Sequence, residues 1–315
     1  MVTSGASSAV PPGAVPTGGV GPLTGDARSQ PTEERAAPGP SRRRELGAPS
    51  GRSLLLTVLG EFVLPRGRAV WTQVLLDVLS GLGVEPKSAR QALARTAAEG
   101  LLESERDGRR VRWSLSTAGR SLLTDGAERI YGFGTPGPDW DGRWLVVLVS
   151  VPESRRQLRH RLRSRLAWAG MGSPAPGVWL SPHPDKQHEV AQVIEELELV
   201  GVSSSFVGAF GAVGRERELM AQAWDLAEVE AAYQDFITAF STEDPRTPDQ
   251  VLRAQIRLVH QWRRFPFLDP QLPGELLPVS WPGPMAYSLF HDLHGRWALD
   301  AGRCWDGLFE RLAGP

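Results

Sequence analysis

Three amphipathic segments followed by a hairpin signal restrict the fold of this chain more than any other feature. SLLLTVLGEFV (53–63), VWTQVLLDVLSGLG (70–83) and EPKSARQALARTAAEGLL (85–102) each carry apolar residues at helical spacing. LLESERDGRRVRWSLS (101–116) then alternates apolar and polar residues after an Asp-Gly pair, which predicts a β-hairpin. Three helices followed by a hairpin is the order of a winged helix-turn-helix, a DNA-binding fold.

The third predicted helix separates polar residues from small ones. On a helical wheel, the polar arc holds Lys87, Ser88, Arg90, Gln91 and Arg95. The opposite arc holds Ala89, Ala92, Leu93, Thr96, Ala97 and Gly100. Arginine pairs favourably with guanine and glutamine with adenine, so we expect the polar arc to read base edges in a major groove. The alternative is a solvated surface helix.

The hairpin is expected to bring further cations to the DNA backbone. With Asp107-Gly108 as the two-residue turn, the cross-strand pairs would be Arg106–Arg109, Glu105–Arg110 and Glu103–Arg112. Glu105 and Glu103 would then form ion pairs with Arg110 and Arg112. Arg106 and Arg109 would remain at the tip for contacts with phosphates.

Composition gives weaker constraints. The formal net charge is −1, but residues 51–130 carry 12 basic and 9 acidic groups, and residues 215–315 carry 10 basic and 15 acidic groups. Thirty-three of the 35 basic residues are arginine, as in proteins from GC-rich genomes, so arginine clusters are discounted as evidence. The single cysteine, Cys304, excludes an internal disulfide framework. No apolar run is long enough for a membrane span or a signal core, so a cytoplasmic protein is expected.

The chain divides into four predicted regions. Residues 1–50 are rich in proline and glycine and are expected to be a disordered tail. Residues 51–133 form the expected winged-helix domain, ending in a short helix. Residues 140–214 form a ferredoxin-like domain, and residues 215–315 a mainly helical domain. The predicted fold class is therefore α+β and multidomain.

The ferredoxin-like prediction rests on an alternation of strands and helices. The expected strands are WLVVLVSVPES (144–154), PAPGVWLSPHP (174–184) and SSSFVGAFG (203–211), and they are separated by two helices. The first of these helices is rich in arginine. It is suited to DNA phosphates, to an acidic partner, or simply to water.

The C-terminal region is predicted to contain helices over 223–240 and 247–264. A stretch with six prolines between residues 266 and 284 follows and is neither regular helix nor strand. Its large apolar residues must pack on something.

Long phrases in all three regions resemble the PaaX family, bacterial repressors of phenylacetate-catabolism genes. They include SLLLTVLGEFVLPRG, ARQALARTAAEGLLESERDGRRVRW, WDGRWLVVLVSVPESRRQLRHRLRSRLAWAGMGSPAPGVWLSPHP and WRRFPFLDPQLPGELLP, and the resemblance runs from about residue 51 to residue 312. It implies a homodimeric repressor that binds a palindromic double-stranded operator. It also implies release by an aryl-coenzyme A thioester, and phenylacetyl-coenzyme A is the effector of the best-known members.

An effector of this kind needs guanidinium groups for its phosphates and aromatic groups for its rings. We expect the effector site at His260, Trp262, Arg263, Arg264, Phe265 and Phe267. The alternative is that this segment is a packed interface between the second and third domains.

The resemblance also brings in a rival function. The central domain of the family is similar to the ferredoxin-like nuclease subunit of CRISPR adaptation systems, which places a metal-binding aspartate near the end of its first strand. Here that strand ends Val149-Ser150-Val151-Pro152, and the first acid is Glu153. We therefore expect a dimerisation or spacer domain, no enzyme activity and no cofactor. A protein-interaction module acting through the acidic C-terminal third is a further alternative.

A metal site is not expected either. His291, Asp292, His294 and Cys304 are close together in sequence, but two histidines on one helix face do not make a full ligand set.

Overall fold

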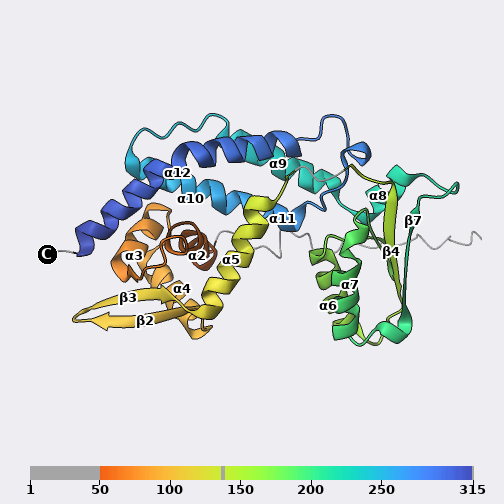
Figure 1. The fold of residues 1–315 in the computed structure, drawn as a ribbon, viewed down its shortest axis with the longest axis horizontal. Coiled ribbons are helices and arrows are strands. Elements are labelled where there is room, and N and C mark those ends of the chain that lie inside the picture. Colours follow the sequence, from red (N-terminus) through yellow and green to blue (C-terminus); the bar gives the residue numbers. More distant parts are fainter. Residues whose placement is uncertain (1–49, 136–138, 314–315) are drawn as a thin grey trace, which may run out of the picture. The chain divides into compact units, whose positions relative to one another are not determined.

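The structure, a computed structural model, describes residues 50–135 and 139–313 (Figure 1). The tail expected over residues 1–50 lies outside the described residues, except for Ser50. The architecture is α+β, as predicted, with an N-terminal winged-helix domain, a central ferredoxin-like domain and a C-terminal helical domain. Within the described ranges, none of the helices combines the length and apolar content that crossing a bilayer requires.

The winged-helix domain contains four α-helices and a small sheet. Its helices are α2 (Gly51–Val58), α3 (Thr72–Gly81), α4 (Pro86–Ala98) and α5 (Thr117–Gly132), and a π-helical turn, η1 (Leu59–Val63), continues α2. Its strands are β1 (Val70–Trp71), β2 (Leu102–Asp107) and β3 (Arg110–Leu115), which pair antiparallel in the order β1-β3-β2. The predicted sequence of three helices and a hairpin is confirmed.

The second predicted helix begins later than expected. Val70 and Trp71 form strand β1, opposite Trp113 and Arg112 of β3, and the helix starts at Thr72. The backbone of Trp71 is extended, with φ −69° and ψ 141°. Val70 is β-branched and Trp71 is aromatic, and both residue types favour strands. Their pairing partner is β3, which is distant in sequence and therefore is not revealed by helical periodicity.

The predicted hairpin register is wrong by two residues. The turn is Gly108-Arg109, and Asp107 lies opposite Arg110 and Glu105 opposite Arg112. Gly108 has a positive φ of 59°, the backbone conformation that the first central position of a type II′ turn requires. This register also pairs the buried side chains of Leu102 and Leu115 at the base of the hairpin.

The central domain has the strand order of a ferredoxin-like fold. Its elements are β4 (Arg143–Val149), α6 (Arg156–Trp168), β5 (Gly172–Ala175), β6 (Val178–Ser181), the 3₁₀ turn η2 (Pro184–Lys186), α7 (Gln187–Glu196), the 3₁₀ turn η3 (Val200–Val202) and β7 (Ser203–Ala209). The sheet order is β5-β6-β4-β7, and every neighbouring pair is antiparallel. The single strand predicted over 174–184 is in fact the end of β5, a turn and β6, because Gly177 adopts a positive φ of 78° and turns the chain.

Each face of the central sheet has its own core. Leu145, Val147 and Val149 of β4 pack under α6 and α7. On the other face, Trp144 and Leu180 pack with α8 (Glu216–Ala223) and with apolar residues that follow α11. The alternation along β4 therefore places successive side chains in different cores.

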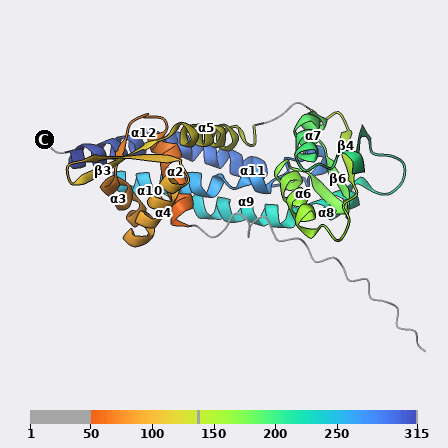
Figure 2. The same ribbon diagram turned by 90° about the horizontal axis from the view of Figure 1, so that it is seen from below.

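The C-terminal domain is built from α9 (Leu226–Phe240), α10 (Pro248–Trp262), the short α11 (Phe265–Leu268), the 3₁₀ turn η4 (Gly274–Leu276) and α12 (Gly283–Ala313). Figures 1 and 2 show α9, α10 and α12 lying alongside one another. Helices over roughly 223–240 and 247–264 are confirmed, and so is the irregular proline-rich stretch between α11 and α12. The 31-residue α12 was not anticipated.

The winged-helix and C-terminal domains share one hydrophobic core. Trp262 of α10 stacks on Phe290 of α12, with ring centroids 4.6 Å apart. Phe62 of η1 stacks on Trp305 of α12 at 5.0 Å, so the core continues without interruption into the winged-helix domain. The two regions that the sequence separates by a central domain are one packing unit.

A buried carboxylate joins the same two domains. Glu61 lies in η1 with its side chain 10% exposed. Its Oε1 accepts hydrogen bonds from Nε2 of His294 at 2.9 Å and from Nε2 of Gln255 at 2.8 Å, and the hydroxyl of Tyr131 donates to Oε2. Burial by itself would raise the pKa of Glu61, but these bonds and the charge of His294 hold that pKa below its ordinary value.

We predict that Glu61→Ala lowers the free energy of unfolding by about 3–5 kcal/mol, because it leaves the fully buried Gln255 of α10 and the partly buried Tyr131 of α5 and His294 of α12 without their acceptor. Urea unfolding followed by circular dichroism measures this loss. Glu128→Ala, which removes an exposed carboxylate from α5, is the matched control and should have little effect. Equal stability of the two variants would contradict a linking role for Glu61.

Candidate nucleic-acid interface

Helix α4 presents a continuous polar face to solvent. All five residues predicted to contact DNA on this helix are exposed: Lys87, Ser88, Arg90, Gln91 and Arg95. Ala94 and Ala98 lie among them and are also exposed, so no large apolar side chain interrupts this face. The structure thus brings the five predicted residues together on one surface.

The opposite side of α4 is buried in the winged-helix core. Ala89, Ala92, Leu93 and Thr96 are buried, and the hydroxyl of Thr96 donates to the carbonyl of Ala92 at 2.8 Å instead of remaining unpaired. Gly100, which the helical wheel placed on this side, is exposed and takes a positive φ of 77° just after the helix. Small side chains let α4 pack closely against its neighbours.

Two contacts fix α4 relative to α2. A Cβ atom on Gly51 would meet Cγ1 of Val84 at 3.0 Å, so the start of α2 lies against the segment that leads into α4. At the other end of the helix, Arg52 of α2 forms an ion pair with Glu99. The direction of the polar face is therefore set by the packing of the domain.

The cations of the polar face are not neutralised by the protein. Among the described residues, Lys87, Arg90 and Arg95 form no ion pair, and the same holds for Arg106 and Arg109 of the hairpin. All five are exposed. A polyanion binding here would not have to displace internal salt bridges.

The hairpin is anchored at its base and open at its tip. Nε1 of Trp113 donates to Oγ1 of Thr72 at 2.9 Å, and that hydroxyl donates to the carbonyl of Val111 at 3.0 Å. Arg112 pairs with Glu105 at 3.2 Å and lies 5.2 Å from the ring of Trp71. The prediction that Arg112 forms an ion pair with a glutamate is confirmed, but the partner is Glu105 and not Glu103.

The residues predicted to hold an effector are divided between the core and the surface. Trp262 and Phe265 are 0% exposed and pack with Phe236 and Phe290, so their rings are not accessible to a ligand in this structure. His260, Arg263, Arg264 and Phe267 are partly exposed. Phe267 makes an edge contact with Trp168 of α6, with ring centroids 4.6 Å apart.

The polar members of this segment contact the winged-helix domain. Nη1 of Arg263 donates to the carbonyl of Ser53 at 2.8 Å, and Nδ1 of His260 lies 3.0 Å from the hydroxyl of Thr57. The segment is thus an interface, as the alternative proposed, but mainly with α2 rather than with the central domain. Burial and the charges of Arg263 and Arg264 lower the pKa of His260 to about 4.

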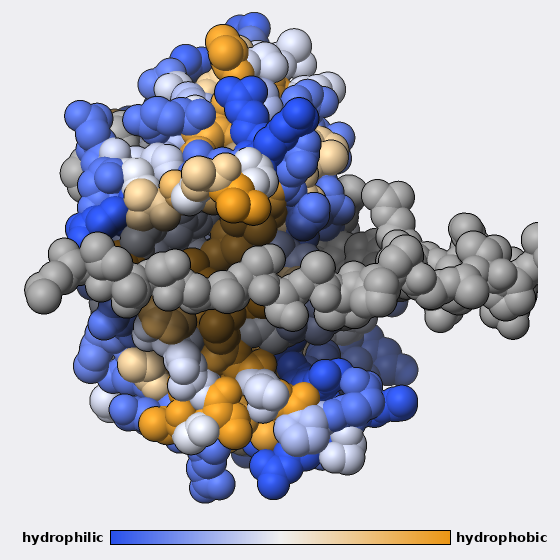
Figure 3. Space-filling model, turned by 90° about the vertical axis from the view of Figure 1, so that its right-hand side faces the viewer, coloured by the Kyte–Doolittle hydropathy of each residue, from blue (hydrophilic) through white to orange (hydrophobic). Residues whose placement is uncertain are grey.

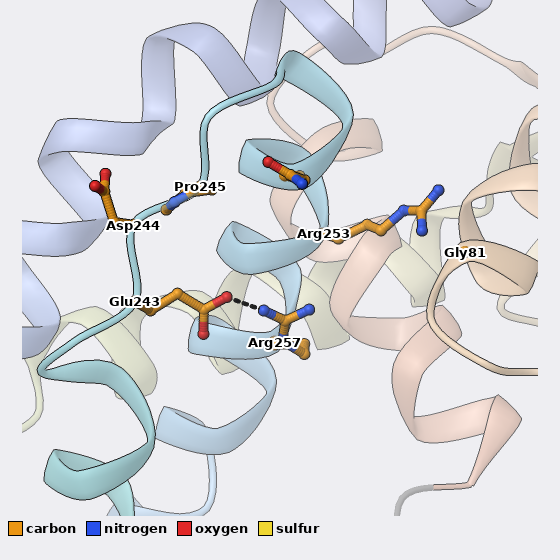
Figure 4. Close-up of a pocket in the computed structure, with 7 residues that line it drawn as sticks. Gly81, Glu243, Asp244, Pro245, Arg253 and Arg257 are labelled. Carbon is orange, nitrogen blue, oxygen red and sulfur yellow. Dashed lines mark hydrogen bonds and ion pairs between the residues drawn. The ribbon is translucent and has the colours of Figure 1, made fainter.

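A hollow of about 340 Å³ lies between the end of α3 and the start of α10 (Figure 4). Arg253 reaches across it to Gly81, where a Cβ atom would meet its Nε at 2.7 Å. Its two arginines are already paired, Arg253 with Asp249 and Arg257 with Glu243. None of the residues predicted to bind an effector lines this hollow.

The central domain presents no carboxylate at the end of β4. Ser150, Val151 and Pro152 follow the strand, and Glu153 is exposed and forms an ion pair with Arg159. Within residues 50–135 and 139–313, no group of three or more histidine, cysteine, aspartate or glutamate side chains is arranged to hold a metal ion. His294 binds Glu61 instead.

Sequence reasoning missed the residues that join this interface to the rest of the chain, namely Glu61, Tyr131, Gln255 and His294. One signal was present. Glu61 is the only charged residue in the apolar run from Ser53 to Leu64, and a charge in such a run needs buried partners.

Comparisons with known proteins match all three regions. A family model described as PaaX-like protein matches residues 50–119, one described as PaaX protein central Cas2-like domain matches residues 137–220, and one described as PaaX-like protein C-terminal domain matches residues 224–307. The transcriptional repressor PaaX of Escherichia coli (strain K12) is 32% identical over 261 residues, which cover 78% of this chain and 80% of that protein.

A solved structure has a similar fold. The uncharacterized protein Rv0674 from Mycobacterium tuberculosis is 21% identical and superposes with a TM-score of 0.56, covering 81% of this chain and 98% of that one. At this level of identity the likeness concerns the fold alone.

The histidine at the interface with α2 predicts a pH dependence of stability. Because the pKa of His260 is about 4 in the fold and near 6.5 when unfolded, the unfolded state binds a proton that the fold excludes. The contribution of neutral His260 to the free energy of unfolding is therefore fully present above pH 6.5 and is lost as the pH falls toward 4. We expect this residue to account for up to about 2 kcal/mol of the loss, after allowance for solvent screening.

Thermal unfolding between pH 7.5 and 4.5 tests this expectation. His260→Gln should flatten the decline, whereas His160→Gln, at an exposed position of α6, should follow the wild-type curve. If both variants lose stability as steeply as the wild type, protonation of His260 is not the cause of the loss.

Proposed function

Because the chain belongs to the PaaX family, we propose that it is a transcriptional repressor that binds its operator through the polar face of α4. The observation that carries this proposal is the pairing of an exposed donor-rich face with a buried face of small residues on one helix. A winged helix-turn-helix places this helix in the major groove. The name and function of the Escherichia coli relative support the same reading.

The proposed contacts fall into two classes. Arg90 and Gln91 lie in the middle of the exposed face, where arginine and glutamine side chains can form bidentate bonds to guanine and adenine. Lys87, Ser88 and Arg95 are proposed to contribute base-edge or phosphate contacts around them. Arg109 lies in the turn of the hairpin, but Arg106 lies in β2 opposite Val111 and not at the tip as the sequence predicted. Both are proposed to contact phosphates alone.

The proposed repressor acts as a homodimer on a palindromic operator and is released by an aryl-coenzyme A thioester. Its proposed targets are genes of aromatic acid catabolism, of which phenylacetate degradation is the type suggested by the family resemblance. The position of Arg264 and Phe267 supports a site beside α11, because they offer a guanidinium and a partly exposed ring within one helical turn. Trp262 and Phe265 are proposed to support this site from the core instead of contacting the ligand.

A ligand beside α11 is well placed to influence DNA binding. His260 and Arg263, which precede α11, contact Thr57 and Ser53 of α2, and α2 packs against α4. An effector that favours a different packing of α10 on α2 would shift the chain away from the DNA-binding arrangement.

The proposal does not include nuclease activity. The match to a Cas2-like model concerns the fold of the central domain, and β4 is not followed by a carboxylate that would bind a catalytic metal.

We predict that Arg90→Ala or Gln91→Ala weakens operator binding by about 1–3 kcal/mol and relaxes the base preference at the position each residue reads. Arg109→Ala should instead reduce the slope of log K against log salt by about 0.9, because it removes one phosphate contact. Fluorescence anisotropy with the chain's own promoter fragment and with scrambled DNA measures both effects.

Arg296→Ala is the matched control, since it removes an exposed arginine from α12. It should leave affinity, base preference and salt slope unchanged. If Arg90→Ala weakens binding equally on operator and scrambled DNA, the residue is a phosphate contact and not a base reader.

For the effector, we predict that phenylacetyl-coenzyme A or a related aryl thioester raises the melting temperature by mass action, whereas free coenzyme A raises it less. Arg264→Ala should reduce this increase without weakening operator binding, and Arg296→Ala should leave it intact. No change in melting temperature with any acyl-coenzyme A compound would contradict the proposed class of effector.

A further inference from the structure

The first helix of the central domain carries a high concentration of positive charge. Six of the eleven residues from 155 to 165 are arginines, and none is an aspartate or a glutamate. This helix, α6, lies with α7 on one side of the central sheet, and Leu162 and Leu166 form its buried face (Figures 1 and 2). None of the six arginines is buried: Arg155, Arg156, Arg159, Arg161, Arg163 and Arg165.

Four of these arginines are not neutralised by an acidic side chain in the part of the chain that the structure describes. Arg159 forms an ion pair with Glu153, and Arg165 forms one with Glu196. The other four form no ion pair there and are exposed, and they make up the α6 arginine surface: Arg155, Arg156, Arg161 and Arg163. The charge of this surface therefore faces solvent.

The α6 arginine surface extends over two helical turns. Arg156 and Arg163 are seven positions apart and lie on the same flank of α6, about 10.5 Å apart along the helix axis. Arg161 lies on the other flank. Every exposed side chain between residues 155 and 165 is polar, so no apolar group interrupts the surface.

This arrangement is unfavourable for α6 in the free protein. Arginines three or four positions apart, such as Arg156 with Arg159 and Arg159 with Arg163, repel each other on a helix. The first turn of α6 also lacks an acidic residue, whereas α7, α8, α9 and α10 each carry one or two there. A helix that only covered the sheet would gain nothing from this pattern.

The rest of the central domain does not share this positive charge. Six of the eight lysines and arginines of residues 140–214 lie between residues 155 and 165. The neighbouring α7 has three glutamates and no lysine or arginine. Figure 3, which views the molecule from the side of β7 and α8 in Figure 1, shows apolar residues among the hydrophilic ones. A general preference for arginine would spread these residues over the domain, so it does not explain their concentration on α6.

We propose that the α6 arginine surface is a second DNA-binding surface, which contacts phosphates of the duplex that flanks the base pairs read by α4. The proposal rests on the operator binding of the proposed function and adds to it a contact without base preference. Guanidinium groups suit this task, because their planar array of donors matches phosphate oxygens and their charge is permanent.

Flanking DNA is favoured over an acidic protein as the occupant because the chain itself brings the DNA close. Ten residues separate α5 from β4, and an extended chain of ten residues spans at most about 36 Å. Once α4 holds its operator, the adjoining duplex therefore stays within reach of the central domain, and the second contact forms within the same complex. A duplex also presents a row of phosphates, which can neutralise arginines on both turns of α6 together.

Fluorescence anisotropy of the full chain tests the proposal with Arg156→Gln/Arg163→Gln on two DNA fragments. One is the shortest promoter fragment that retains the base preference, and the other extends it on each side by about 15 base pairs, or about 50 Å, of arbitrary sequence. The variant should bind the longer fragment about 10-fold more weakly than the wild type at about 0.1 M salt, and its slope of log K against log salt should be smaller by about 1.8, because two phosphate contacts are lost. Its affinity for the shorter fragment and its base preference should not change.

Arg217→Gln/Arg296→Gln is the matched control, since it removes two exposed arginines from α8 and α12 and changes the net charge by the same amount. It should bind both fragments as the wild type does. Equal losses of affinity in the two double variants would show an effect of net charge alone and would overturn the proposal.

Thermal unfolding of the free protein distinguishes a binding surface from a structural one. At low salt, Arg156→Gln/Arg163→Gln should melt at the temperature of the wild type or above it, because the substitution removes repulsion between like charges. Any difference should become smaller at high salt. A lower melting temperature would show that these arginines stabilise the fold, which contradicts the proposal.

The two levels of the account fail in different ways. If the wild type binds its operator with a base preference and the α6 variant equals it on both fragments, the α6 arginine surface faces an acidic protein or only water, and this proposal alone fails. If the wild type binds no promoter fragment, the proposed function fails and this proposal fails with it.

Discussion

The packing of four small or apolar residues of α4 against α2 and α3 decides which face of this helix the chain presents to solvent. Ala89, Ala92, Leu93 and Thr96 are spaced so that all of them can be buried only if the helix turns its other side outward. A larger residue at either alanine would push α4 away from α2. The orientation of the donor-rich face is therefore a consequence of core packing, and the hairpin extends the same surface.

The winged-helix domain does not depend on its own core alone. Stacked pairs such as Phe62 with Trp305 continue its core into α12, and Glu61 collects hydrogen bonds from three helices across the same boundary. The Glu61 carboxylate restricts the relative positions of Tyr131, Gln255 and His294, because each lost hydrogen bond would leave a polar atom in the core unsatisfied. The C-terminal domain and the winged-helix domain are therefore joined by direct packing and hydrogen bonds.

The architecture was largely predictable from local patterns. Helical periodicity and an Asp-Gly pair gave the three helices and the hairpin, and alternating strands and helices gave the ferredoxin-like domain. The errors occurred where a distant or backbone-level constraint overrides the local pattern. Trp71 joins β3 instead of α3, and the hairpin turns at Gly108-Arg109 because glycine accommodates a positive φ at the first turn position.

The candidate site was predictable to different degrees for a related reason. The polar arc of α4 is a local property, so all of its residues were correctly placed on one exposed face. A ligand site depends on which rings remain accessible after packing, and sequence alone did not reveal that Trp262 and Phe265 are core residues. The contacts of Arg263 with α2 join residues 210 positions apart, which no local pattern reports.

The most direct test is hydrogen–deuterium exchange of the full chain with and without its promoter fragment, followed by peptide. If α4 enters the major groove, amides in peptides covering residues 86–98 and 102–115 should exchange more slowly in the complex, while those of α8 and α9 remain unchanged. Slower exchange elsewhere in the chain, with α4 and the hairpin unaffected, would show that DNA binds another surface and would contradict the account.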